Sequence, residues 1–281
     1  MDLALADHVV LVTGASGALG RATAEAFAAE GARVALHGHT AADEMDAWLL
    51  GQPWRGRSMT VTGDLRSPDA MAAAVESVRA AWGRVDVCVA NAGKWPAEDQ
   101  RLDECSVERI RDTIEVNLLG SMWTARAFFA CLAKTGPRTD GHGASLVFVG
   151  STAGRFGERF HADYAAAKAG LVGLALSLKN EIVLLDPFAR VNVVEPGWTI
   201  GHRPKPALER PGVITRVVRT MPLRQLGRAV DIAAAIVMLS SPAASRHVSG
   251  EVLTVAGGME GRVLWGDDDV DEKAVRRRLG N

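Results

Sequence analysis

Short apolar runs alternate with longer helical segments along almost the whole chain. The first run, residues 8–13, is β-branched and apolar at nearly every position, which is typical of a strand buried on both faces. Similar runs follow at residues 33–37, 58–62, 85–90, 144–150, 190–194 and 251–255. Segments with helical spacing lie between them, at residues 21–30, 67–82, 107–133, 162–185 and 230–240. Strands that alternate with helices predict one α/β domain over residues 1–281, built on a seven-stranded parallel sheet.

Two segments depart from this alternation. Residues 196–222 carry five prolines and predict a mostly irregular loop. Residues 266–281 combine an acidic cluster with three consecutive arginines. This C-terminal tail predicts either a short terminal helix whose charges match its dipole, or a mobile arm.

Composition narrows the class of protein. Apolar residues make up 48% and charged residues 23%, as in a globular protein, and the formal net charge of −1 argues against a dedicated nucleic-acid binder. No stretch of about 18 uninterrupted apolar residues is present, and the N-terminus lacks the basic start and cleavage site of a signal peptide. The three cysteines are scattered and form no C-x-x-C pair. We therefore expect a cytoplasmic protein with free thiols, no metal site, no nucleic-acid partner and no membrane partner.

A glycine-rich turn follows the first strand. It reads T-G-A-S-G-A-L-G over residues 13–20, and an Ala-rich helix comes after it. Glycines in such a turn let the backbone approach a pyrophosphate, whose charge is met by the helix N-terminus. The alternative interpretation is a plain strand-to-helix corner. In this context we expect dinucleotide binding, with contacts from Gly14, Ser16, Gly17, Leu19 and Gly20.

The end of the second strand bears on the choice of dinucleotide. A strand-end acid often holds the free ribose hydroxyls of NAD, yet here the chain reads L-H-G-H-T and the next acid is Asp43. A 2′-phosphate could be contacted by His37, His39, Thr40 and Arg21, although a solvated loop would carry the same residues. The pattern favours NADP(H), with NAD(H) as the alternative.

Two further strand ends carry polar or small residues. Asp64 and Leu65 close the third strand, where an acid can accept a hydrogen bond from the adenine amino group or simply begin the next helix. Asn91, Ala92 and Gly93 close the fourth strand. These small residues would let a cofactor come close to the backbone, although an ordinary turn would also contain them.

The chain has a single tyrosine, Tyr164, and Lys168 lies four residues after it. On a helix the two share one face, where the ammonium would lower the phenol pKa from about 10 and suit it for acid–base chemistry. A surface pair is the plainer interpretation. Ser151 ends the fifth strand, where its hydroxyl could bond a substrate carbonyl. Asn117 lies inside an apolar helical stretch, where its buried amide needs hydrogen-bond partners. A functional amide and a purely structural one would both meet this need.

Taken together, these motifs resemble the short-chain dehydrogenase/reductase family. The similarity runs from Val9 to about Gly258 and includes the glycine-rich turn, N-A-G, the strand-end Ser, Tyr-x-x-x-Lys and Pro196-Gly197. It is closest in composition to the compact branch that contains 3-oxoacyl-(acyl-carrier-protein) reductases and many ketone reductases. The resemblance implies a three-layer, doubly wound Rossmann fold and a homodimer or homotetramer.

The resemblance also implies a role for each residue of the motifs. Tyr164 exchanges a proton with the substrate oxygen, and Ser151 polarises the carbonyl. Lys168 lowers the pKa of the phenol and holds the nicotinamide ribose, and Asn117 supports a water-linked proton relay. The implied cofactor-binding set is Gly14, Ser16, Gly17, Leu19, Gly20, His37, His39, Asp64, Leu65, Asn91, Ala92, Gly93, Tyr164, Lys168, Pro196, Gly197 and Thr199.

The glycine-rich turn departs from the usual pattern of the compact branch, T-G-x-x-x-G-x-G. The middle glycine is Gly17 here, and Ala18 stands where the family has glycine. The residue before the middle glycine is not basic, unlike in many proteins that use NADP.

Residues 196–222 are expected to form the lid over the substrate. Either substrate contact or packing between lid and body is expected for Trp95, Phe156, His161, Trp198, Ile200, His202 and Arg203. The Tyr/Lys helix ends in V-L-L-D without basic residues, which counts against an acyl-carrier-protein partner. We expect a small-molecule carbonyl or alcohol as the substrate.

The main hypothesis is an NADP(H)-dependent oxidoreductase that transfers a hydride between nicotinamide and a carbonyl or alcohol, with Tyr164 as general acid and base. The alternatives are an NAD(H)-linked alcohol or polyol dehydrogenase, and a catalytically quiet nucleotide-binding regulator. The helices at 107–133 and 162–185 are apolar on more than one face, which predicts a helix-on-helix subunit interface.

Overall fold

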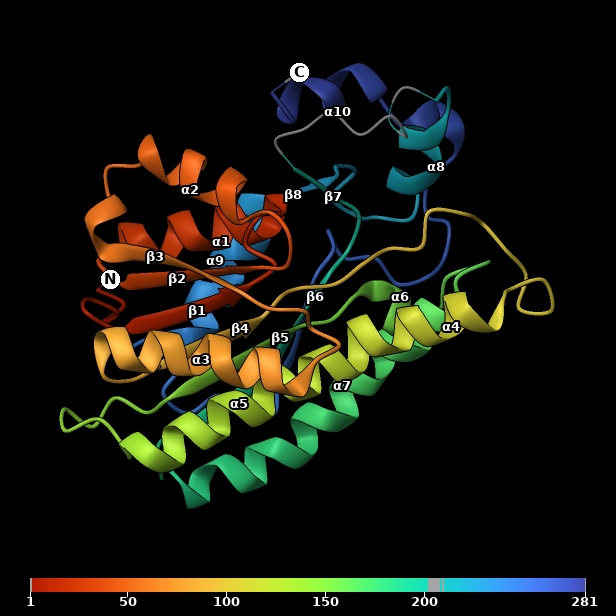
Figure 1. Cartoon of the computed structure of the whole chain (residues 1–281). Coiled ribbons are helices and arrows are strands. Elements are labelled where there is room, and N and C mark those ends of the chain that lie inside the picture. The colour runs from red at the N-terminus through yellow and green to blue at the C-terminus, as the bar shows by residue number, and fades with distance from the viewer. Residues whose placement is uncertain (1, 202–207, 209, 281) are drawn as a thin grey trace.

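Seven parallel strands form one sheet in the order β3-β2-β1-β4-β5-β6-β9 (Figure 1). The computed structural model describes residues 2–201, 208 and 210–280. The strands are β1 (Val9–Thr13), β2 (Arg33–Gly38), β3 (Ser58–Thr62), β4 (Val87–Ala90), β5 (Ser145–Val149), β6 (Arg190–Pro196) and β9 (Val252–Val255). The order of the strands reverses between β1 and β4, the kind of switch point at which open α/β sheets bind ligands. The prediction of a doubly wound, seven-stranded parallel sheet is confirmed.

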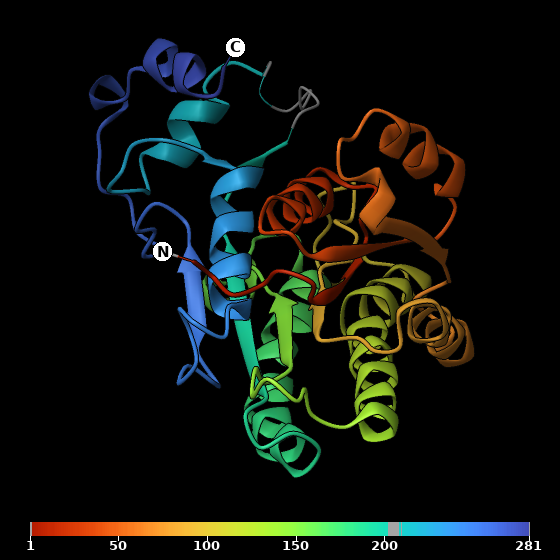
Figure 2. The ribbon, with the colours of Figure 1, turned by 90° about the vertical axis from the view of Figure 1, so that its left-hand side faces the viewer.

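Helices cover both faces of the sheet, which makes three layers (Figures 1 and 2). One face carries α1 (Ala18–Ala29), α2 (Ala42–Leu50) and α9 (Ala229–Ser240). The other carries α3 (Pro68–Trp82), α5 (Gly120–Thr135) and α7 (Ala162–Glu181). The remaining elements near the sheet are α4 (Val107–Ile114), the π-helical turn η2 (Glu115–Leu119), α6 (Thr152–Phe156), and the 3₁₀ turns η1 (Arg55–Arg57) and η3 (Ile182–Leu184).

The apolar runs read from the sequence supply two cores, one on each face of the sheet. In β1, Val10 and Val12 pack toward α1 and α9, whereas Val9 and Leu11 pack toward α3, α5 and α7. Successive side chains of a strand point to opposite faces, so a strand between two helical layers is apolar throughout. α3 begins where the sequence indicated, since the Ser67 hydroxyl accepts a hydrogen bond from the backbone N–H of Ala70.

One long helix among the described residues is as apolar as a membrane-spanning helix. The continuous helical stretch from Val107 to Thr135 passes a length and hydropathy test for a membrane span. Half of its most apolar window is buried inside the protein, where α5 packs against α3. Core helices of soluble proteins pass the same test, so this helix is weak evidence for a membrane span.

A smaller core lies outside the sheet, beyond the carboxyl end of β6. It combines β7 (Thr199–Ile200), α8 (Val213–Val218), β8 (Gly227–Arg228) and α10 (Glu272–Arg278), with the turn η5 (Asp267–Asp269) leading into α10. Figure 2 shows these elements as a separate lobe at the top left. The described part of 196–222 is therefore more ordered than expected, and residues 202–207 and 209, with His202 and Arg203, lie outside the described residues.

The C-terminal tail forms the short helix that was one of its two expected states. Asp271 caps α10 by accepting a hydrogen bond from the N–H of Ala274, and arginines fill its last turn. Glu272 accepts hydrogen bonds from the N–H and the hydroxyl of Thr215 on α8, at 3.1 and 2.8 Å. Val275 is buried in the smaller core. The tail is thereby attached to the segment 196–222.

Candidate active site

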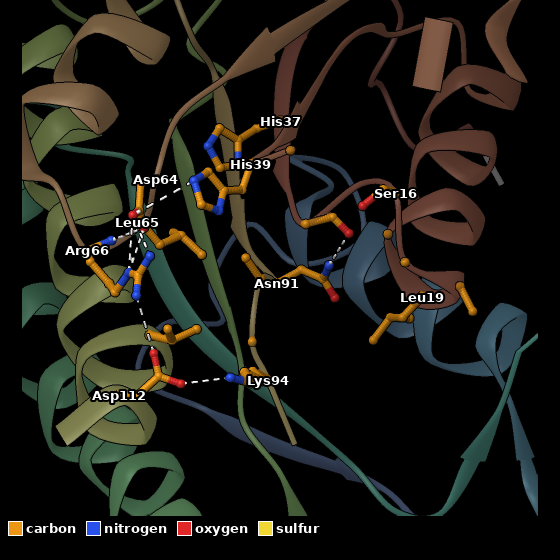
Figure 3. Close-up of a pocket in the computed structure, with 18 residues that line it drawn as sticks. Ser16, Leu19, His37, His39, Asp64, Leu65, Arg66, Asn91, Lys94 and Asp112 are labelled. Carbon is orange, nitrogen blue, oxygen red and sulfur yellow. Dashed lines mark hydrogen bonds and ion pairs between the residues drawn. The ribbon is translucent and has the colours of Figure 1, made fainter. Parts of the chain in front are cut away.

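A pocket of about 540 Å³ opens at the carboxyl ends of β1, β2 and β4 (Figure 3). Twelve of the predicted cofactor residues line it together: Gly14, Ser16, Gly17, Leu19, Gly20, His37, His39, Asp64, Leu65, Asn91, Ala92 and Gly93. The other five, Tyr164, Lys168, Pro196, Gly197 and Thr199, are not among its lining residues. Residues from four separate segments thus meet at the switch point of the sheet.

Two glycines of the turn are there for steric reasons. Gly14 has φ of +65°, and a Cβ on it would lie 2.7 Å from the Cα of Ala92. A Cβ on Gly20 would lie 2.3 Å from the carbonyl oxygen of Gly14. A side chain at either position would push the turn away from β4 and from the start of α1. These contacts fit a turn that must stay close to a pyrophosphate.

The ends of β1 and β4 are tied to each other beside this turn. The Asn91 side chain donates to the carbonyl oxygens of Thr13 (2.8 Å) and Gly14 (3.3 Å). The Thr13 hydroxyl accepts from the N–H groups of Asn91 and Ala92, both at 3.1 Å. The Asn91 amide therefore has a structural role in holding the turn.

His37 and His39 lie in different environments although both line the pocket. His37 is buried, its Nε2 lies 3.1 Å from the carbonyl oxygen of Gly63, and burial lowers its pKa to about 4. Its buried Nδ1 has no hydrogen-bond partner among the described residues. The His39 side chain is about half exposed, with Nε2 3.8 Å from a carboxylate oxygen of Asp64. His39 is thus the better placed of the two to meet an anionic ligand.

We expect His37 to make the protein sensitive to acid. The unfolded chain binds a proton on this ring at about pH 6.5, while the folded protein resists it until about pH 4, so lowering the pH through this window favours unfolding. The full effect is about 3 kcal/mol. Denaturant unfolding measured at several pH values should show that the free energy of unfolding falls less steeply with falling pH in His37→Asn than in the unchanged protein. His247→Gln, a change at an exposed histidine, should leave this pH dependence unchanged.

Three charged residues of the pocket were not found from the sequence: Arg66, Lys94 and Asp112. Arg66 forms a two-point ion pair with Asp64, which lowers the pKa of that carboxyl to about 2. Asp112 accepts from Lys94 Nζ at 2.8 Å and from Arg66 at 3.5 Å (Figure 3). Arg66 and Lys94 directly follow the motifs D-L and N-A-G, so adjacency could have indicated them. Asp112 lies on a polar helix face and gives no such signal.

Lys168 is buried on α7, beneath the predicted catalytic tyrosine. Its Nζ donates to the carbonyl oxygen of Val149 at 2.9 Å and lies 5.7 Å from the centroid of the Tyr164 ring. Burial lowers the pKa of Lys168 to about 8. A Cβ on Gly93 would lie 3.2 Å from this Nζ and 2.8 Å from Asn117 Oδ1, so glycine is needed where the three residues meet.

The pKa of Tyr164 differs in direction from the expectation. Burial raises it above the usual value of 10, and a hydrogen bond with the Ser151 side chain opposes that rise. The nearby ammonium does not offset the burial, because Lys168 is itself buried and donates to a backbone carbonyl. Ser151 is held in place as the cap of α6, where its Oγ accepts from the N–H of Ala153 at 3.1 Å.

Asn117 is fully buried within the π-helical turn η2. Its amide donates to the carbonyl oxygens of Lys94 and Thr113, each at 3.0 Å, and its Oδ1 accepts from the N–H of Lys94 at 3.0 Å. Such π turns interrupt helices most often at functional sites. The hydrogen-bond partners that the Asn117 amide was expected to need are therefore backbone groups, and two of these bonds fix the loop after β4.

The residues expected around the substrate divide into two groups. Trp95 lies against His161 and Tyr164, with ring centroids 4.1 and 4.8 Å apart. Trp198 instead packs against the smaller core, and Ile200 is buried within it. Phe156 is partly exposed on α6. Thr199 donates to the carbonyl oxygen of Gly197 at 2.9 Å, just beyond Pro196.

Comparison with known proteins defines the class. Residues 14–260 match the family model described as enoyl-(acyl carrier protein) reductase. The 3-oxoacyl-(acyl-carrier-protein) reductase FabG of Escherichia coli (strain K12) is 36% identical over 257 residues, which cover 89% of this chain and 96% of that protein. The L-rhamnose 1-dehydrogenase (NAD(P)(+)) of Azotobacter vinelandii is 33% identical over 261 residues, 91% of this chain and 97% of that protein.

A solved structure gives the same answer. A short-chain dehydrogenase/reductase from Brucella melitensis, described as glucose/ribitol dehydrogenase, is similar with a TM-score of 0.77 at 30% identity, covering 92% of this chain and 99% of that one. The fold and these relatives define an NAD(P)-dependent oxidoreductase that acts on CH–OH or carbonyl groups. The chain belongs to the short-chain dehydrogenase/reductase family. Membership of this enzyme family argues against the quiet regulator.

Proposed function

We propose that the protein is an NADP(H)-dependent oxidoreductase of a small carbonyl or alcohol compound, with Tyr164 as general acid and base. The observation that carries the proposal is that Ser151, just after β5, and Tyr164 and Lys168 of α7 come together, with Ser151 close enough to influence the pKa of the Tyr164 phenol and Lys168 Nζ 5.7 Å from the centroid of its ring. Carboxyl ends of strands in such sheets face the ligand.

The bound nicotinamide cofactor supplies or accepts the hydride at the carbonyl carbon. In reduction the Tyr164 hydroxyl gives its proton to the substrate oxygen, and Ser151 donates a hydrogen bond to the same oxygen. A phenol whose pKa is above 10 is protonated at neutral pH, which suits it for that step. The positive charge of Lys168 stabilises the phenolate that remains, and Asn117 fixes the loop that borders it.

The cradle around Gly14, Gly17 and Gly20 fits the pyrophosphate of a dinucleotide, and Asn91 would keep the turn in place beside it. The wall that faces the adenosine ribose supports the choice of NADP(H). It carries the half-exposed His39, and the end of β2 carries no acid, whereas the guanidinium of Arg66 is paired with Asp64. NAD(H) stays the second candidate because buried His37, with its lowered pKa, brings no positive charge there.

Cofactor titration tests this choice. We expect NADPH to bind about tenfold or more tightly than NADH, because charge-assisted hydrogen bonds to a phosphate contribute about 1.5 to 3 kcal/mol. Fluorescence titration of each cofactor gives the two Kd values. His39→Gln should weaken NADPH binding and leave NADH binding unchanged. Equal affinities in the unchanged protein would remove the preference for NADP(H).

The assembly and the location of the protein are also proposals. A homodimer or homotetramer through α5 and α7 is supported by partly exposed apolar side chains on both helices, among them Met122 and Leu176. Action in the cytoplasm is supported by the cysteines, which are free thiols and buried at Cys88 and Cys131. We also propose that segment 196–222, with its smaller core, is the lid over the substrate.

A further inference from the structure

An aromatic surface lies next to the proposed proton donor and has no role in the mechanism above. The Trp95 ring centroid is 4.8 Å from that of Tyr164, with 68° between the ring planes. Even so, 49% of Trp95 is exposed. A half-exposed indole directly beside a proton donor offers a large apolar face that a ligand at this site can cover.

The indole is held from behind. The His161 ring stacks on it at 4.1 Å with 25° between the planes, and His161 itself is 2% exposed. The two nitrogens of His161 lie 3.3 Å from the carbonyl oxygen of Arg159 and 3.2 Å from that of Pro96. The ring behind Trp95 therefore cannot turn without losing both contacts.

Arg109 fastens the two loops that carry this stack. Its guanidinium donates to the carbonyl oxygens of Glu98 (2.9 Å), in the loop after β4, and Phe160 (3.1 Å), in the loop before α7. It also donates to Gln100 Oε1 at 2.9 Å and, at 3.1 and 3.4 Å, to the two oxygens of the buried Asp163. These contacts match the five N–H donors of the side chain. The platform is thus rigid before any ligand arrives.

The same contacts indicate what kind of ligand suits the platform. A polyhydroxylated substrate such as a sugar requires free donors and acceptors around the ring it stacks on. Of the polar side chains that hold the stack, His161 contacts backbone carbonyls and all the N–H groups of Arg109 are already used. Lys94 pairs with Asp112, and the exposed Asp99 lies 3.9 Å from His161 Nε2. A flat apolar ring requires no such partners.

Resting on the proposed role of Tyr164, we propose that Trp95 determines substrate specificity, by stacking on a planar aromatic ring attached to the reacting carbonyl. The substrate class is therefore an aryl ketone or the corresponding secondary alcohol. The carbonyl oxygen then lies toward the phenol while the ring covers the indole. Trp95 acts on binding of the ring and takes no part in proton transfer.

Steady-state kinetics with matched ketones test the proposal. We expect a higher kcat/KM for acetophenone than for cyclohexyl methyl ketone, which has a ring of similar size but no aromatic face. Trp95→Ala should lower kcat/KM for acetophenone about 10- to 100-fold, mainly through KM, with a far smaller effect on 2-butanone. Trp95→Phe, which keeps a ring, should retain most of the preference. Leu50→Ala, at an exposed apolar residue of α2, should change none of these values.

Equilibrium binding keeps this test independent of turnover. 2-Acetonaphthone binding to the NADP⁺ complex, measured by calorimetry, should weaken about 10- to 100-fold in Trp95→Ala. Unchanged binding, or an equal loss for aromatic and aliphatic ketones, would overturn the role of Trp95 and leave that of Tyr164 intact. If no ketone is turned over but 2-acetonaphthone binding still depends on Trp95, the proposed reaction is refuted and the role of Trp95 in binding aromatic rings is supported.

Discussion

Replacing Tyr164 with Phe should lower kcat by about 10² to 10⁴, the range that general acid–base groups contribute. Phe keeps the ring that contacts Trp95 and lies above Lys168, so the fold and the NADPH affinity should hardly change. Rapid mixing of enzyme, NADPH and ketone gives the rate of hydride transfer, and fluorescence titration gives the affinity. A variant that kept more than about a tenth of the turnover would refute the role of the phenol.

The composition of the chain makes a second readout unusually clean. Tyr164 is the only tyrosine, so any phenolate absorbance in a pH titration comes from this residue. Because burial raises its pKa above 10, the free protein should show no phenolate near neutral pH, and Tyr164→Phe should abolish the signal at every pH. A phenolate at neutral pH in the cofactor-free protein would contradict this account of the pKa.

The largest expected effect on stability comes from Arg190, at the start of β6. Its buried guanidinium donates to the carbonyl oxygens of Leu239, Ser240 and Ser245, at the end of α9 and just after it. Arg190→Met would leave these carbonyls buried without partners, and we expect a loss of about 3 to 5 kcal/mol in the free energy of unfolding. Urea unfolding followed by circular dichroism measures it.

A surface arginine provides the control for this prediction. Arg79 pairs with Glu76 at 2.6 Å on α3, where both side chains are partly exposed. Arg79→Met should lower the free energy of unfolding far less than Arg190→Met, because water replaces the partner of an exposed ion pair. Similar losses in the two variants would show that the contacts at the end of α9 contribute little.

The sheet could be predicted from sequence because its signal is local. The five central strands are buried at nearly every position and therefore read as largely apolar runs, and the glycines and capping residues at their ends mark the turns. The same holds for the proposed cofactor pocket, since Gly14, Asp64 and Asn91 all lie within two residues of a strand end. Carboxyl ends of neighbouring strands meet at one edge, so proximity follows from topology.

The remaining features depend on packing between distant segments. The spacing of Tyr164 and Lys168 in the sequence does not reveal that the pKa of Tyr164 is raised, because this shift is caused by burial. Asp112 joins the pocket through Lys94 and Arg66, which come from other strand ends. The order of segment 196–222 was underestimated because its helix α8 packs against α10, which lies about 60 residues later in the chain.

The attachment of α10 to α8 has a consequence for synthesis on the ribosome. The match to the family ends at residue 260, and by then every strand of the sheet has been made. The smaller core still lacks Val275, and α8 lacks the carboxylate of Glu272. A nascent chain can therefore complete the pocket at the carboxyl ends of β1, β2 and β4 before the lobe beyond β6 has its last wall. Ribosome stalling or proteolysis near residue 260 would yield a protein that retains the pocket residues without a finished lobe.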